Sequence, residues 1–166
     1  MIEDITLKNC LEFAIKTEEI GSQLYERLAK KLSHNTDVSK IFKQLGRDEL
    51  VHKKQFSKLL AQLPNEVGIV ESPEKREYVK AMSISEFFSP THGPFANIDE
   101  IEDYYDALER AFGLEKATLS FYKAVEDILG ENEILVQVIE EEKRHIVAIM
   151  KVMTTGAKFR SLQDKW

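Results

Sequence analysis

Six residues that can bind metal ions interrupt four amphipathic segments of this chain. They are four glutamates and two histidines, and each histidine stands three residues after a glutamate: Glu18, Glu49, His52, Glu115, Glu142 and His145. Apolar residues recur at steps of three and four around them, so each lies on a helix face that would otherwise be buried. Burying one unpaired charge costs on the order of several kcal/mol, so four carboxylates need raised pKa values or bound cations.

The grouping predicts a centre for two divalent metal ions. Four carboxylates offset the charge of two such ions, and two neutral imidazoles complete the ligand set. One Glu from each of two helices, with Glu-x-x-His from each of two others, is the ligand pattern of di-iron carboxylate bundles. We therefore expect two iron ions. Manganese suits the same ligands, whereas zinc is less suited because six ligands exceed its usual four.

An internal repeat strengthens the prediction, because a Glu-x-x-His pair alone is a weak signal. Laying Glu18 on Glu115 also lays Tyr25 on Tyr122. Both halves then contain a Glu, a Tyr, a turn and Glu-x-x-His in the same order. The alternative, that the six residues are surface charges or isolated core residues, would have to hold for all of them together. The two tyrosines are either plain core aromatics or hydroxyl donors to a ligand carboxylate.

The prolines indicate where long helices can lie. All four fall in the middle of the chain, at Pro64, Pro73, Pro90 and Pro94. Proline is costly inside a helix, so the flanking stretches permit long helices. Turn signals at residues 33–37 and at Gly130 divide each stretch in two. We expect four helices, roughly over residues 4–32, 37–62, 98–129 and 131–154.

The connections between these helices run short, long, short. This order predicts an all-α fold in which two antiparallel helix pairs are joined by one long crossover, a known four-helix bundle topology. The length of the chain fits a single domain over residues 1–166. Within the crossover, a short helix is expected from Glu74 to Ser83, and three aromatic residues are expected to pack on the bundle: Phe87, Phe88 and Phe95. The stretch from Lys158 to Trp166 is expected to form a short docked helix.

Composition and charge bound the functions. The net charge of −6 and the lack of a basic stripe argue against nucleic-acid binding. One cysteine, Cys10, permits no intrachain disulfide and no cysteine-based zinc or iron–sulfur site within the chain. No apolar run approaches the ~20 residues of a membrane span, and Met1 to Asn9 does not resemble a signal peptide. We expect no membrane association and a cytoplasmic location.

Two acidic residues precede the Glu-x-x-His glutamates and are candidates to orient the histidines. Metal-bound histidine usually donates its second N–H to such a group. We hypothesise that Asp48 orients His145 and that Glu141 orients His52, each from across the bundle.

The order of Glu18, Tyr25 and Glu49-Leu-Val-His52, with its second copy, resembles the rubrerythrin branch of the ferritin-like superfamily. The resemblance covers both helix pairs and implies a ferritin-like bundle whose di-iron centre reduces hydrogen peroxide. It also implies a role for each ligand: Glu18 and His52 at one iron, Glu115 and His145 at the other, and Glu49 and Glu142 as bridges.

The sequence departs from rubrerythrins in two ways. Rubrerythrins commonly carry a four-cysteine rubredoxin domain, which a chain with one cysteine does not contain, so we expect a separate electron donor. Typical rubrerythrins also carry an extra Glu three residues from the ligand on the third helix. Here Thr118 and Phe112 flank Glu115 at that distance, and neither replaces a carboxylate. The resemblance therefore implies a plainer, six-ligand centre.

Three functions stay open at this point. The first is a di-iron oxidoreductase that reduces peroxide with electrons from an external donor. The second is a ferroxidase or iron-handling protein that uses dioxygen. The third is a metal-stabilised interaction module without turnover. The expected partners are peroxide or dioxygen, a separate electron donor and, by resemblance, a second copy of the chain in a homodimer.

Overall fold

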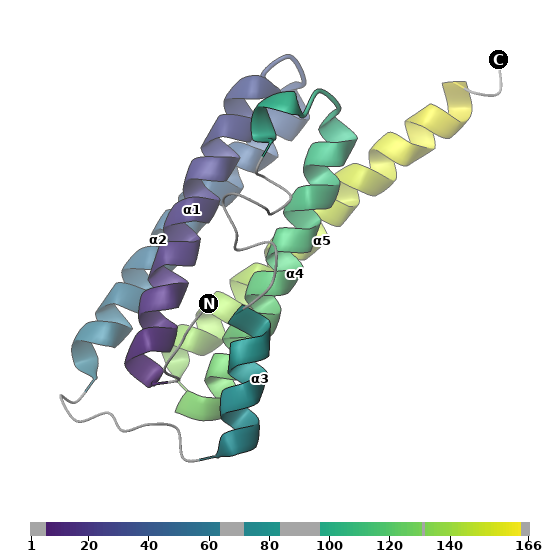
Figure 1. Cartoon of the computed structure of the whole chain (residues 1–166). Helices are drawn as coiled ribbons and strands as arrows, with labels where there is room; N and C mark the ends of the chain where they lie inside the picture. Colours follow the sequence, from purple (N-terminus) through teal and green to yellow (C-terminus); the bar gives the residue numbers. More distant parts are fainter. Residues whose placement is uncertain (1–5, 64–71, 84–96, 131, 164–166) are drawn as a thin grey trace.

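Helices make up most of the computed structural model, which describes residues 6–63, 72–83, 97–130 and 132–163. In chain order they are α1 (Leu7–Lys31), α2 (Thr36–Gln62), α3 (Pro73–Ser83), the short 3-10 helix η2 (Ile98–Glu100), α4 (Tyr104–Leu129) and α5 (Glu133–Gln163) (Figure 1). The predicted four long helices are confirmed. None of the helices in these ranges is long and apolar enough to cross a membrane.

The helix ends follow from local capping chemistry. Asn35 precedes α2, and its side chain accepts a hydrogen bond from the backbone N–H of Val38 at 3.2 Å. Gly130 ends α4 with a φ of 77°, a conformation that favours glycine. The prediction that this helix begins at residue 98 was wrong. Asp103 caps α4 instead, so the preceding residues form only η2 and a short extended link.

The helices form the predicted bundle of two antiparallel pairs. α1 packs along α2 and α4 packs along α5, and the pairs meet through α1 with α4 and α2 with α5 (Figure 1). The crossover helix α3 packs on α4. It begins at Pro73, where the missing N–H costs nothing, and Ser72 Oγ accepts a hydrogen bond from the N–H of Lys75. The predicted crossover helix is thus confirmed, while Phe87, Phe88 and Phe95 lie outside the described residues.

The last helix differs from its prediction. Instead of ending at residue 154 before a separate docked helix, α5 continues without a break to Gln163. Figure 1 shows its last turns extending beyond the end of the bundle, so the predicted docking is wrong for the described part of residues 158–166. The physical reason is the lack of a strong stop signal. Gly156 costs a helix only about 1 kcal/mol relative to alanine, and no proline follows.

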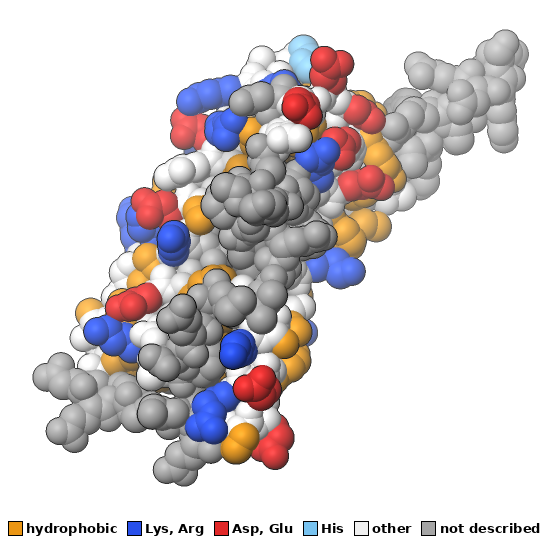
Figure 2. Space-filling view, in the orientation of Figure 1, with side chains coloured by type: hydrophobic (Ala, Val, Ile, Leu, Met, Phe, Trp, Pro, Cys, Tyr) orange, Lys and Arg blue, Asp and Glu red, His pale blue; other side chains and the backbone are white. Residues whose placement is uncertain are grey.

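Two apolar clusters fill the bundle, one towards each end. The first contains residues from all four long helices, among them Leu11, Phe56, Val125 and Val138. The second does so as well, with Leu28, Phe42, Leu108 and Ile149 among its members. The metal-binding candidates fall between the two clusters along every helix. On the face that Figure 2 shows, basic and acidic side chains are interspersed over the outside of the bundle.

Close packing of α1 on α2 depends on Gly46. A Cβ built on this residue would lie 3.3 Å from the backbone oxygen of Ser22 and 3.4 Å from Cβ of Tyr25. The hydroxyl of Ser22 also donates a hydrogen bond to the Gly46 oxygen at 2.8 Å. The two backbones therefore approach each other so closely here that a side chain at residue 46 would require its neighbours to move.

We predict that Gly46→Val lowers the free energy of unfolding by about 1–3 kcal/mol, because the branched side chain pushes the two helices apart. Urea denaturation of the metal-free protein measures the change. Arg47→Val introduces the same residue at the neighbouring exposed position and serves as the control. Equal effects of the two substitutions would contradict the proposed close contact.

Candidate metal centre

The structure brings all six candidate residues into one buried layer between the two apolar clusters. α1 and α4 each contribute one glutamate, and α2 and α5 each contribute Glu-x-x-His. None of the six residues is more than 4 % exposed: Glu18, Glu49, His52, Glu115, Glu142 and His145. Helical spacing accounts for this, since residues three apart lie on the same helix face.

The six residues form two overlapping groups. One group consists of Glu18, Glu49, His52 and Glu142; the other consists of Glu49, Glu115, Glu142 and His145. Within each group, one oxygen or nitrogen atom per residue lies within 4.8 Å of all the others. Glu49 and Glu142 belong to both groups. This geometry therefore fits two adjacent metal ions that share two carboxylates.

Both histidines turn the same ring nitrogen towards the carboxylates. Nδ1 of His52 lies 3.0 Å from Oε1 of Glu142 and 3.2 Å from Oε2 of Glu49. Nδ1 of His145 lies 3.2 Å from Oε2 of Glu115. The two rings stack with their centroids 5.4 Å apart. Each Nδ1 is thus placed to act as a ligand atom, and a ring that binds metal through Nδ1 would carry its proton on Nε2.

Comparison with known proteins agrees with this geometry. Residues 9–90 match the family model described as Rubrerythrin. The chain is rubrerythrin-like. No curated protein and no solved structure matches it. The matched range holds most of α1 and all of α2 and α3, with Glu18, Glu49 and His52, while the internal repeat supplies the corresponding residues of the second helix pair. Together with the all-helical architecture, the match identifies the fold as a ferritin-like bundle.

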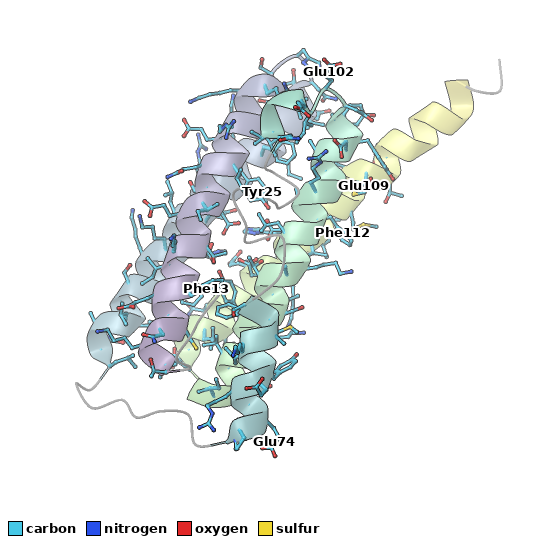
Figure 3. The ribbon with its side chains drawn as sticks, in the orientation of Figure 1. Phe13, Tyr25, Glu74, Glu102, Glu109 and Phe112 are labelled. Atoms are coloured by element: carbon cyan, nitrogen blue, oxygen red, sulfur yellow. The ribbon has the colours of Figure 1, made fainter. Side chains whose placement is uncertain are left out.

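Two tyrosines connect the helix pairs of this rubrerythrin-like bundle. The hydroxyl of Tyr25 on α1 donates to Oε1 of Glu115 on α4 at 2.5 Å. In the reverse direction, the hydroxyl of Tyr122 on α4 donates to Oε1 of Glu18 on α1. Figure 3 shows Tyr25 between α1 and α4. The structure therefore supports the second interpretation of the sequence, in which the tyrosine hydroxyls donate to glutamates. The rings are also fully buried in the core.

Burial raises the pKa of both tyrosines well above its usual value, and the neighbouring carboxylates raise it further. Their hydroxyls therefore keep their protons at neutral pH. This allows each to remain a hydrogen-bond donor to its glutamate.

One of the two predicted orienting contacts is present. Oδ2 of Asp48 lies 3.5 Å from Nε2 of His145, across the α2–α5 contact. Burial would raise the pKa of Asp48, but hydrogen bonds from His145 and Gln44 outweigh it and lower the pKa. Glu141, in contrast, accepts a hydrogen bond from Arg144 on its own helix and is not among the described groups that face His52. The prediction for Glu141 was wrong because this residue turns to the surface.

A further polar residue of the site was missed as a contributor by sequence reasoning. Thr118 is buried, and its hydroxyl lies 2.8 Å from Oε2 of Glu142. In the sequence it counted only as a residue that does not replace a carboxylate. A threonine on a buried helix face gives no distinctive pattern, because its hydroxyl ordinarily bonds to its own helix backbone.

Burial and repulsion between like charges raise the pKa values of carboxyl groups in the layer. Burial raises the pKa of Glu49 well above its usual value, and the charges of Glu18, Glu142 and Glu115 raise it further. Burial and the charge of Glu115 raise the pKa of Glu142 to about 7. These shifts mean that the metal-free layer relieves its repulsion by taking up protons.

The histidines respond in the same direction. Burial alone would lower the pKa of His52, but its contacts with Glu142 and Glu18 raise it to about 9. The pKa of His145 likewise rises, against burial, to about 11 through Asp48 and Glu115. Protonated imidazoles therefore balance part of the carboxylate charge when no other cation does.

The residues of the layer fit a divalent metal ion. Oxygen and imidazole nitrogen ligands suit divalent iron and manganese. Among the described residues, Oε1 of Glu142 is a buried side-chain atom without a hydrogen-bond partner, and it lies in this layer 3.0 Å from Nδ1 of His52. Buried polar atoms are rarely left unpaired. A cluster of carboxylates and imidazoles with such atoms is what a metal site requires.

We predict that the metal-free protein becomes less stable as the pH rises. The pKa of Glu142 is about 7 in the folded chain against an ordinary value of 4.5, so its contribution is complete below 4.5 and lost as the pH passes about 7. The contribution of His52 is complete below 6.5 and lost as the pH passes about 9. In both cases the folded state binds more protons, and stability falls with pH. Urea denaturation in chelator between pH 5 and pH 9 tests this.

Glu142→Gln provides the control for this measurement, since it removes one titrating carboxyl from the layer. The decline in stability should be shallower in this variant. A free energy of unfolding that rises over the same interval in the parent protein would contradict the prediction.

Proposed function

We propose that this rubrerythrin-like chain holds two iron ions and reduces hydrogen peroxide with electrons from an external donor. The observation that carries the two-ion site is the overlap of two four-residue groups that share Glu49 and Glu142, and the likeness to rubrerythrins over residues 9–90 supports peroxide as the oxidant. In this proposal these two glutamates bridge the ions. The terminal ligands are Glu18 and His52 for one ion, and Glu115 and His145 for the other.

Two bound ferrous ions would supply the two electrons that, with two protons, convert one peroxide molecule into two waters. The chain's own residues provide the environment for that reaction. The tyrosine hydroxyls hold Glu115 and Glu18 in place, which limits the number of conformations these carboxylates adopt. The apolar clusters on either side limit access of bulk water and strengthen electrostatic interactions in the layer.

The electrons must come from outside the described part of the chain. Cys10, the one cysteine, is fully buried, and burial raises the pKa of its thiol to about 12. A buried, protonated thiol is a poor redox group. We therefore propose a separate protein or small-molecule reductant. Iron is proposed in preference to manganese because the reaction requires a metal that changes its oxidation state readily, although the same ligands suit both ions.

We predict that Asp48→Asn weakens ferrous iron binding by about 10- to 100-fold, because His145 loses the carboxylate that orients its outer nitrogen. Anaerobic competition with a chromogenic chelator measures the affinity. Glu141→Gln is the matched control, since it makes the same chemical change one residue before Glu142 without touching a histidine. If both variants bind iron like the parent protein, Asp48 has no orienting role.

The decisive experiment is stopped-flow oxidation of the anaerobic, ferrous-loaded protein, with peroxide and dioxygen compared side by side. We expect two irons per chain and oxidation by peroxide that is much faster than oxidation by dioxygen. The reverse preference would favour a ferroxidase or iron-handling protein. A chain that fails to hold two irons would refute the proposed centre and leave a non-catalytic interaction module.

A further inference from the structure

The two shared glutamates have unequal neighbours. On α4, the hydroxyl of Thr118 lies 2.8 Å from Oε2 of Glu142. In the internal repeat, Gly21 on α1 takes the position of Thr118 on α4. Gly21 lies against Glu49, because a Cβ built on it would lie 3.6 Å from Cγ of that glutamate. Each shared glutamate thus faces the same position of the partner helix in its pair, but only Glu142 meets a hydroxyl there.

The contacts of the terminal glutamates do not share this inequality. Tyr25 donates to Glu115, and Tyr122 donates to Glu18, so the repeat is preserved in both directions. All four of these residues are buried. The tyrosine contacts of the terminal glutamates are therefore the same in both halves, whereas the contacts of the shared glutamates differ.

The hydroxyl of Thr118 has more than one acceptor in reach. Besides Glu142, the backbone oxygens of Leu114 and Glu115 lie at 3.3 and 3.0 Å. A threonine in a helix commonly donates to such a carbonyl, and a hydroxyl has one proton to give. The carboxylate oxygen is the nearest of the three, and ionised acceptors form the stronger hydrogen bonds. The proton is therefore best placed on the bond to Glu142.

We propose that Thr118 is a positioning residue that holds Glu142 in one conformation, and that Glu49, which faces glycine, is the shared carboxylate that rearranges when metal binds or leaves. The inference rests on the proposed metal centre. A glutamate side chain has several rotatable bonds, and a hydrogen bond to a fixed partner removes much of that freedom. Glu142 has such a bond from the rigid interior of α4, whereas the glycine beside Glu49 provides none. The contact of Glu49 with Nδ1 of His52, at 3.2 Å, would be lost when that nitrogen binds metal.

The direct test is a pair of crystal structures of the full chain, one metal-free and one loaded with manganese(II) alone. Manganese(II) suits the same ligands and avoids redox changes during crystallisation. We expect the Glu142 carboxylate to keep its conformation in both structures and the Glu49 carboxylate to change. If Glu142 moves as much as Glu49, or moves while Glu49 stays, the proposal is overturned.

Four variants separate the hydroxyl from simple packing. Thr118→Val keeps the shape but removes the hydroxyl, and we expect manganese(II) affinity to fall about tenfold, as loss of a hydrogen bond to a charged group does. Thr118→Ser restores the hydroxyl and should restore the affinity. Gly21→Ser places a hydroxyl beside Glu49, and the Glu49 carboxylate should then keep one conformation with and without metal. Gly21→Ala adds the Cβ alone, at ordinary contact distance, and should behave like the parent protein.

The outcomes distinguish the inference from the proposed function. A parent protein that binds no manganese(II) or iron(II) refutes the metal centre itself. A parent protein that binds metal while Thr118→Val binds it equally well refutes only the role of Thr118. If Thr118→Val does not fold, as judged by helical circular dichroism, metal-free and manganese(II)-loaded structures of Gly21→Ser and Gly21→Ala decide the question. If the Glu49 carboxylate changes between the two forms equally in both variants, the proposal is overturned.

Discussion

Four carboxylates buried at one level of a helical bundle are the constraint on which the rest of this structure depends. Their charges repel one another, and the apolar clusters above and below keep water from screening them. The surrounding groups reduce that repulsion in several ways. Two tyrosines and a threonine donate hydrogen bonds, the histidines gain protons, and the pKa of Glu49 and of Glu142 rises. Divalent ions in the same space would replace those protons, because metal binding displaces protons from its ligands.

Much of this arrangement could be predicted from the sequence, because helical spacing carries the information. The interruption of each apolar stripe by Glu or Glu-x-x-His places the polar residues at one level once the helices pair. Proline positions and the turn at Gly130 located the pairs. What spacing does not contain is the choice of a side-chain rotamer. Asp48 and Glu141 occupy matching positions, yet one meets His145 and the other turns to Arg144 on the surface.

The other wrong predictions also arose where a local interaction, and not the sequence pattern, decided the structure. Asp103 caps α4 later than apolar periodicity suggested, since a capping hydrogen bond overrides a weak helical pattern. Gly156 does not end α5, because one glycine costs too little without a second stop signal. The contact of Thr118 with Glu142 was not predicted, because nothing in a single sequence distinguishes a threonine that bonds its own helix from one that bonds a side chain of another helix.

The buried carboxylates also bear on whether the bundle serves only as a packing module. Replacing a buried ionic cluster with apolar residues of similar volume is often neutral or stabilising. A bundle with no need for the charges would therefore gain from leucine at these positions, as at Leu45 and Leu108 in the neighbouring cluster. Instead, every long helix places a glutamate in the layer, and two of these glutamates belong to both groups that could hold a metal ion. A sequence that accepts this cost on all four helices is better explained by metal binding than by packing alone.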